Sequence, residues 1–235
     1  MSIAKRAEHM SKLMSRYSQR PFYNKFRDAY LEADDFTSFD ADDDYTVTDI
    51  GSASSTIDVI DGAGGLLEID AVSSTVDKGG QVQHKTETFL PAADKHIIFE
   101  TRLKVSDAIA TFHMFVGLSA LDASLLVSTA NTSPNHIGFE NITTATSSLV
   151  SEKAGTRGSN TSAATLVEDT YIILGFFVDG VTQVVPLVNG VAGTAITSGS
   201  TTTPVTELAA TYALASDGDT DPIMTVDWYY CIQIR

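Results

Sequence analysis

The 235-residue sequence has a single cysteine, Cys231, so no disulfide bond can form within the chain. It has no apolar run close to the ~20 residues of a membrane-spanning helix, and its charged amino terminus lacks the apolar core of a secretory signal. These shortages exclude a disulfide-stapled domain and argue against insertion into a membrane. We therefore expect a soluble protein, made in a cytoplasm, whose fold is held by packing.

Basic residues are scarce: Lys and Arg number 15 against 30 Asp and Glu, which gives a net charge of −15. Seven of the 15 lie in residues 1–30, beside only Glu8 and Asp28, so this segment carries +5 and the remainder −20. Nucleic-acid affinity comes mainly from Lys and Arg that neutralise phosphates. We therefore expect no binding of DNA or RNA by the acidic body of the protein.

Motifs for metal binding and catalysis are also scarce. The five histidines show no metal-ligand spacing, and neither a G-x-S-x-G motif nor a phosphate-binding glycine loop occurs. Asp217, Asp219 and Asp221 have the alternate spacing of a calcium loop, but Pro222 and Trp228 stand where such a loop needs glycine and glutamate. A solvated acidic turn is expected here, with a weak cation site as the alternative, and no cofactor.

The first 33 residues are predicted to form a separate, basic helical arm. Apolar residues recur there every three or four positions, and Pro21 ends the helix or begins a second one over residues 21–34. The arm is the predicted partner-binding element, docked on another chain, on its own domain or on a membrane surface. The side chains expected to make the contact are Ile3, Lys5, Arg6, Met10, Lys12, Leu13, Met14, Arg16, Tyr17 and Arg20.

Residues 34–235 are predicted to form one all-β domain. In HIIFETRLKVS, residues 96–106, Ile97, Phe99, Leu103 and Val105 share one parity and the charged residues share the other, which is the period of a half-buried strand. The dipeptides Asp-Gly at 179–180 and Asn-Gly at 189–190 favour hairpin turns. Many short strands with no helices between them predict an antiparallel sandwich.

Three further expectations concern the second half of the chain. The Ser/Thr/Ala-rich stretches 141–165 and 192–206 are interpreted as surface loops. The closing run MTVDWYYCIQIR is expected to be a strand. Its inner face is assigned to the residues of one parity, which are Met224, Val226, Trp228, Tyr230, Ile232 and Ile234.

The order FETRLKVS, FVGLS, LGFFVDG, VVPLVNGV and MTVDWYYCIQIR resembles the concanavalin-A-like (laminin-G-like) jelly-roll family. The combination DDF…FD, GGLLEID, ETFLP and FETRLKVSD…FVGLS is similar to a jelly-roll protein encoded among tailed-phage virion genes. This resemblance implies a non-enzymatic capsid decoration (cement) protein on the exterior of the virion. It implies binding to the major capsid protein shell, which it stabilises, and self-association as a dimer or trimer.

Two alternatives come with the same resemblance. One is a carbohydrate-binding module on a phage fibre or spike, with the glycan on the concave sheet. The other is a glycosidase, because laminarinase-type members carry E-I-D-x-x-E for a retaining mechanism. The run Glu68-Ile69-Asp70 begins this motif, but Ser73 stands where the acid is needed and cannot deliver a proton near neutral pH. No catalytic residue and no enzymatic activity are therefore expected.

Overall fold

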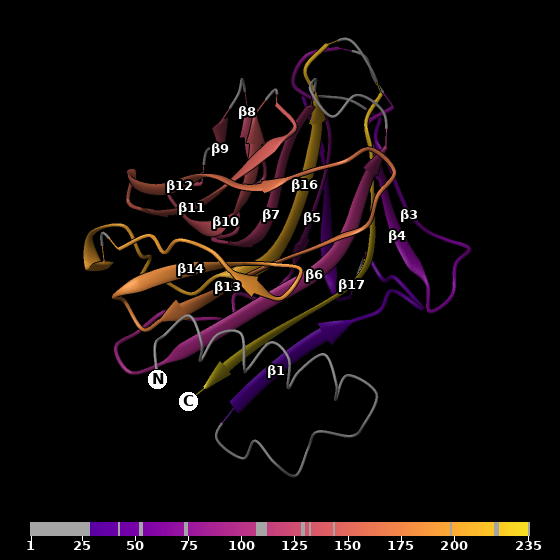
Figure 1. The fold of residues 1–235 in the computed structure, drawn as a ribbon. Helices are drawn as coiled ribbons and strands as arrows, with labels where there is room; N and C mark the ends of the chain where they lie inside the picture. Colours follow the sequence, from indigo (N-terminus) through magenta and orange to yellow (C-terminus); the bar gives the residue numbers. More distant parts are fainter. Residues whose placement is uncertain are drawn as a thin grey trace.

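The computed structural model describes residues 29–41, 43–51, 54–72, 75–106, 112–127, 130–131, 133–142, 144–197, 199–218 and 221–234. They form two antiparallel sheets packed face to face, as the two layers of Figure 1 show. Within these ranges the helical structure is a single 3-10 turn, η2 (Gly199–Thr201), and no helix there is long and apolar enough to cross a membrane. The predicted all-β antiparallel sandwich is confirmed.

The first layer, called the β6 sheet, has the strand order β15-β14-β13-β6-β17-β4-β3, with β1 also paired to β17. Its strands are β1 (Ala29–Asp34), β3 (Thr56–Ile60), β4 (Leu66–Asp70), β6 (His96–Ser106), β13 (Ile172–Asp179), β14 (Gln183–Val188), β15 (Val191–Ala192) and β17 (Ile223–Ile234). The strand that closes the chain, β17, lies between β6 and β4, so the carboxyl end of the sequence is built into the middle of the sheet.

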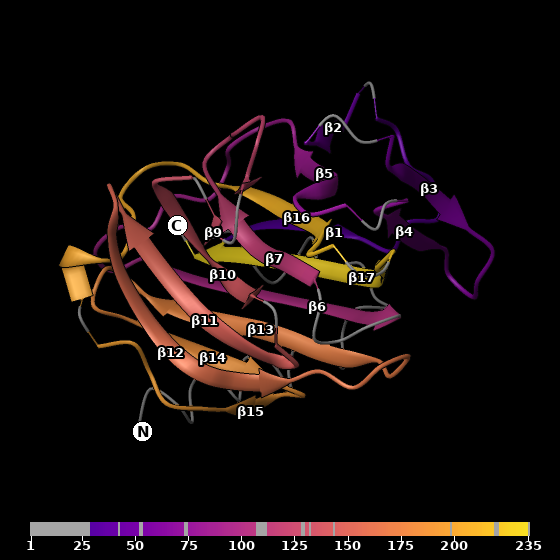
Figure 2. The same cartoon turned by 90° about the horizontal axis from the view of Figure 1, so that it is seen from above.

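The second layer, called the β10 sheet, has the order β12-β11-β10-β7-β16-β5-β2. Its strands are β2 (Tyr45–Ile50), β5 (Lys78–His84), β7 (Phe112–Ser119), β10 (Asn135–Ile142), β11 (Thr146–Lys153), β12 (Thr156–Thr165) and β16 (Ala209–Ser216). A separate hairpin, β8 (Leu126–Val127) with β9 (Ala130–Asn131), follows β7. Figure 2 shows β10, β11 and β12 side by side at one edge of this layer.

The core lies between the inner faces of the two sheets. Ile97, Phe99, Leu103 and Val105 of β6 are buried in it, which confirms the predicted inner face of this strand. The outer face is not fully open as predicted, because Ile98 and Glu100 are each only 2% exposed. The ring of Phe99 stacks on that of Phe176 with centroids 5.2 Å apart. Burying a side chain of this size contributes ~1.5–3 kcal/mol, so the inner faces of the strands supply the main stabilisation.

The predicted faces of β17 are wrong beyond Val226, because the register of its pairing with β6 shifts there. Val226 pairs with Leu103 and Trp228 with Arg102, which leaves Asp227 as an extra residue in a β-bulge. After the bulge Tyr229 and Cys231 face the core. Trp228, Tyr230 and Ile232 instead belong to a second apolar cluster on the outer face of the β6 sheet.

Two predicted segment types are also corrected. Ala29–Asp34, assigned to the helical arm, is strand β1, because its pairing with β17 supplies hydrogen bonds that outweigh the helical preference of the sequence. The stretch 141–165 is not a surface loop: it contains β11 and β12, joined by a two-residue turn at Ala154 and Gly155 with φ of 49° and 81°. Thr is among the residues enriched in strands, and β12 is the edge strand of its sheet.

Both predicted hairpins are present in residues 172–192, but only the Asn-Gly turn has the predicted two-residue form. Asn189 and Gly190 have φ of 50° and 74° and join β14 to β15. In the other hairpin Asp179 is the last residue of β13 and pairs with Gln183, so the loop has three residues, 180–182, and Gly180 has φ of 62°. Residues 1–28 lie outside the described residues, and all ten predicted partner-binding side chains of the arm fall among them.

Candidate functional site

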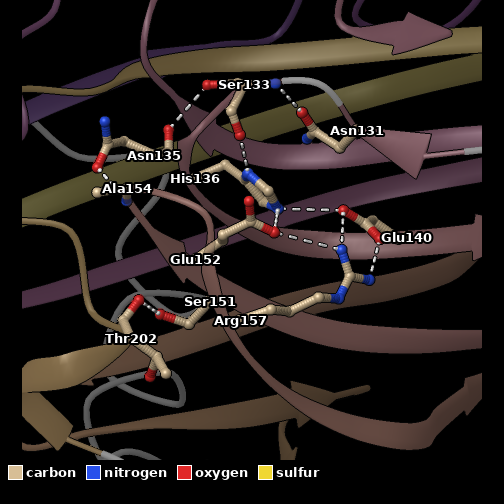
Figure 3. A network of polar contacts seen from close by, with 10 residues as sticks. All are labelled: Asn131, Ser133, Asn135, His136, Glu140, Ser151, Glu152, Ala154, Arg157 and Thr202. Carbon is tan, nitrogen blue, oxygen red and sulfur yellow. Dashed lines mark hydrogen bonds and ion pairs between the residues drawn. The ribbon is translucent and has the colours of Figure 1, made fainter.

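A cluster of ionisable side chains lies on the outer face of β10, β11 and β12 (Figure 3). Ile137 and Phe139 of β10 face the core, so the side chains of His136 and Glu140 project from the opposite face. Glu152 of β11 is paired directly with His136, and Arg157 of β12 is paired directly with Glu152. The three paired residues therefore form a row that runs across the strands, with Glu140 beside it.

Arg157 connects the two carboxylates of this cluster. Its Nη1 lies 3.3 Å from Glu140 Oε1 and 3.7 Å from Glu152 Oε2, and its Nη2 donates a second hydrogen bond to Glu140. The two parallel bonds to Glu140 are the bidentate geometry that guanidinium groups make with carboxylates. Arg157 is 35% exposed and Glu152 15%, whereas Glu140 is only 2% exposed. The charged row is thus open to solvent at its β12 end.

His136 faces both carboxylates in a fixed orientation. Its Nδ1 lies 2.8 Å from the carbonyl oxygen of Ser133, which can only accept, so Nδ1 donates this hydrogen bond. Its Nε2 then points to Glu140 Oε1 at 3.1 Å and to Glu152 Oε2 at 4.0 Å. The ring of Phe115 packs edge-on against the imidazole, with centroids 5.5 Å apart.

Gly138, between His136 and Glu140 on the same outer face, makes room for Phe115. A Cβ atom at this position would lie 2.7 Å from Cε2 of the phenylalanine ring. Any side chain here would therefore displace Phe115 from the histidine. The glycine is part of the packing that orients the cluster.

The environment of Glu140 keeps its carboxyl ionised. Burial alone would raise the pKa, but hydrogen bonds and charge from His136 and Arg157 outweigh burial, so the pKa of Glu140 lies below its ordinary value. An ionised, buried carboxylate held in this way accepts hydrogen bonds or acts as a base or nucleophile. Acting as a proton donor would require it to leave the guanidinium.

The site residues considered from the sequence lie elsewhere. Glu68 and Asp70 are on β4, which belongs to the β6 sheet, whereas the cluster lies on the β10 sheet. Burial and the neighbouring Asp70 raise the pKa of Glu68. Ser73 lies outside the described residues. The E-I-D run therefore contributes nothing to the carboxylate cluster.

The acidic side chains of the turn before β17 do not gather around one point. Asp217 lies 3.2 Å from Nε2 of the buried His113, Asp221 is exposed, and Asp219 lies outside the described residues. In the described part of the chain, no group of three or more His, Cys, Asp or Glu side chains is arranged to hold a metal ion.

Sequence reasoning missed the whole cluster, and the reason lies in β11 and β12. Glu152 and Arg157 belong to a stretch interpreted as a loop because of its Ser, Thr and Ala content. The available signal is the symmetrical pattern around Ala154-Gly155, where Glu152-Lys153 precedes the turn and Thr156-Arg157 follows it. A two-residue turn places Glu152 directly opposite Arg157.

No protein-family model matches this chain, and no curated protein matches it in sequence. Solved structures do match. An endo-1,3-β-glucanase from Streptomyces sioyaensis is 12% identical with a TM-score of 0.62, over 88% of this chain and 97% of that one. A family GH16 protein of a mixed-linkage glucan locus from Bacteroides ovatus is 11% identical with a TM-score of 0.58, over 84% of this chain and 98% of that one. A β-glucanase from Bacillus licheniformis is 13% identical with a TM-score of 0.58, over 85% of this chain and 96% of that one. The chain has the concanavalin-A-like jelly-roll fold of these glucanases.

These neighbours overturn two predictions made from the sequence. The expectation of a non-enzymatic capsid decoration protein, with no enzymatic activity, is contradicted because the matching structures are mainly glucan-cleaving enzymes. The motifs behind it explain the error. Phe99 of FETRLKVS lies in the core, Gly117 of FVGLS lies in β7 where a Cβ atom would meet the backbone of β10, and the Asn-Gly dipeptide forms a turn. They identify the sandwich and carry no information about a virion.

Proposed function

We propose that this protein binds carbohydrate, of the β-glucan class, at the outer face of β10, β11 and β12. The observation that carries the proposal is the row His136, Glu152 and Arg157, with the ionised Glu140 beside it. Carboxylates and a guanidinium fixed by one another present acceptors and donors to sugar hydroxyls at low entropic cost. The fold shared with three glucanases supports the choice of ligand.

Binding is tested by calorimetric titration with a β-1,3-glucan and with a mixed-linkage β-1,3-1,4-glucan. We expect Glu152→Gln and Arg157→Met to weaken binding, because these two side chains are the exposed members of the row. Glu168→Gln, at an exposed carboxylate in the loop between β12 and β13, outside the row, serves as the matched control. Equal affinity in the wild type and the three variants would show that the glucan binds elsewhere on the protein. An absence of binding by the wild type would contradict the proposal.

A second candidate function is hydrolysis of the same class of glycan. The observation that favours it is the pair of carboxylates, Glu140 and Glu152, that share Arg157 and face one imidazole. Glycoside hydrolysis uses two carboxyl groups, one ionised and one protonated. The lowered pKa of Glu140 suits the ionised role, and Glu152, 15% exposed, is the second carboxyl group of the pair.

Hydrolysis is measured as new reducing ends released from the same two glucans. The wild type is expected to release them, and both Glu140→Gln and Glu152→Gln to abolish the release. Binding without any new reducing ends would assign the cluster to recognition alone. Activity that survives in both variants would rule out this carboxylate pair.

A further inference from the structure

The segment that follows β7 lies on the outer face of the β10 sheet. We call residues 120–126 the blocking segment. Its Leu125 and Leu126 are buried at 0% and 4% exposure, and they pack with Phe115 of β7 and with Ala213 and Ala215 of β16. The blocking segment thus covers an outer surface that would otherwise be apolar and open.

Two glutamines of β5 bind the backbone of the blocking segment. Gln81 donates from Nε2 to the carbonyl of Asp122 at 2.5 Å and accepts from the amide of Leu125 at 2.9 Å. Gln83 accepts from the amide of Asp122 at 3.1 Å and donates to the carbonyl of Ala120 at 3.4 Å. Both glutamines are buried, at 0% and 2% exposure, so these bonds form in a dry environment where they are strong.

The covered surface continues the row of the candidate site. Beyond His136, the next residue in register across the strands is Ser119 of β7. The Ser119 hydroxyl accepts from Gln83 Nε2 at 3.0 Å and is fully buried. The row is therefore open at Arg157 and Glu152, has the buried His136 as its floor on β10, and is covered by the blocking segment from Ser119 onward.

We propose that the blocking segment limits the site to the end of a glycan, so that the protein recognises a terminal unit of about two sugars. This inference rests on the proposed function. Neighbouring strands are ~4.8 Å apart, so β10 to β12 spans about 10 Å, roughly the length of two hexose units. A longer glycan lying along the row would meet Ser119 and the segment above it, so it can extend only past β12 into solvent.

The test is a length series of β-1,3-linked and mixed-linkage glucose oligosaccharides, titrated calorimetrically into the full-length protein. We expect affinity to rise up to two or three sugars and then to change by less than about twofold, because further units make no contact. A double variant, Gln81→Ala with Gln83→Ala, releases the blocking segment, and its affinity should continue to rise with length. Gln183→Ala, at a half-buried glutamine of β14 in the other sheet, is the control.

The outcomes separate this inference from the function it rests on. If wild-type affinity keeps rising through six or seven sugars, the blocking segment does not limit the site, although the protein still binds glycan. If neither the wild type nor the released variant binds any oligosaccharide, the proposed function fails and takes this inference with it. Should the double variant not fold, Leu125→Ser provides a milder release, and the wild-type length series alone still decides the question.

Discussion

Arg157 is the residue on which the charge balance of the cluster depends. It binds Glu140 through two hydrogen bonds, and Glu140 is almost fully buried. Removing one partner of a buried pair costs ~3–5 kcal/mol, and the 35% exposure of Arg157 reduces this to about 1–3 kcal/mol. We expect Arg157→Met to destabilise the protein by that amount in urea unfolding. Adding Glu140→Gln should recover much of the loss, and an additive double variant would contradict the pairing.

The pKa of Glu32 is raised, whereas that of Glu140 is lowered. Burial raises the pKa of its carboxyl above the ordinary 4.5, although His84 and hydrogen bonds from Thr88, Tyr229 and Tyr30 act against burial. The folded state therefore holds this proton more tightly than the unfolded state. The contribution of Glu32 to stability is greatest at low pH and declines as the pH rises above about 4.5.

Glu32→Gln should consequently flatten the dependence of stability on pH in this range. The free energy of unfolding, measured by urea titration from pH 4.5 to pH 7, should fall less steeply in the variant than in the wild type. Glu207→Gln, at an exposed carboxylate, should follow the wild type. A slope unchanged by Glu32→Gln would contradict the raised pKa, because it would mean that the hydrogen bonds and His84 cancel the effect of burial.

At the scale of an element, the bulge in β17 decides which aromatic side chains stabilise the core. Tyr229 is 2% exposed in the main core, whereas Trp228 is half-buried on the outer face, where its ring stacks on that of Tyr230 with centroids 5.8 Å apart. We expect Tyr229→Ala to cost about 3–5 kcal/mol and Trp228→Ala about 1–2 kcal/mol in urea unfolding. A larger loss for Trp228 than for Tyr229 would contradict the observed register.

Strand β1 offers a test at the scale of the whole molecule. It pairs with β17 along its full length, and its Tyr30 ring packs against Phe89 with centroids 5.4 Å apart. A chain that begins at residue 35 lacks this strand and exposes the edge of β17 along residues 229–234, while β4 still pairs with residues 223–226. We expect it to melt below a chain that begins at residue 29, and to aggregate more readily, because an open edge pairs with other chains. Equal melting temperatures would show that β1 is dispensable.

The sandwich and much of its detail follow from the sequence by itself. The alternation of β6 and the Asn-Gly turn are local properties, since side chains of a strand point to opposite faces and a two-residue turn needs positive φ. Both appear as predicted at Phe99 and Asn189. The likeness to the concanavalin-A-like fold depends on the same local features.

Only the tertiary structure decided the faces of β17 and the location of the candidate site. A bulge at Asp227 exchanges the two faces of a strand without changing its composition, because register depends on the partner strand. β1 is a strand because β17 offers it an edge. Glu140 and Arg157 lie 17 residues apart in the chain and meet because β10, β11 and β12 pair in register, which no local pattern in a Ser/Thr-rich segment specifies.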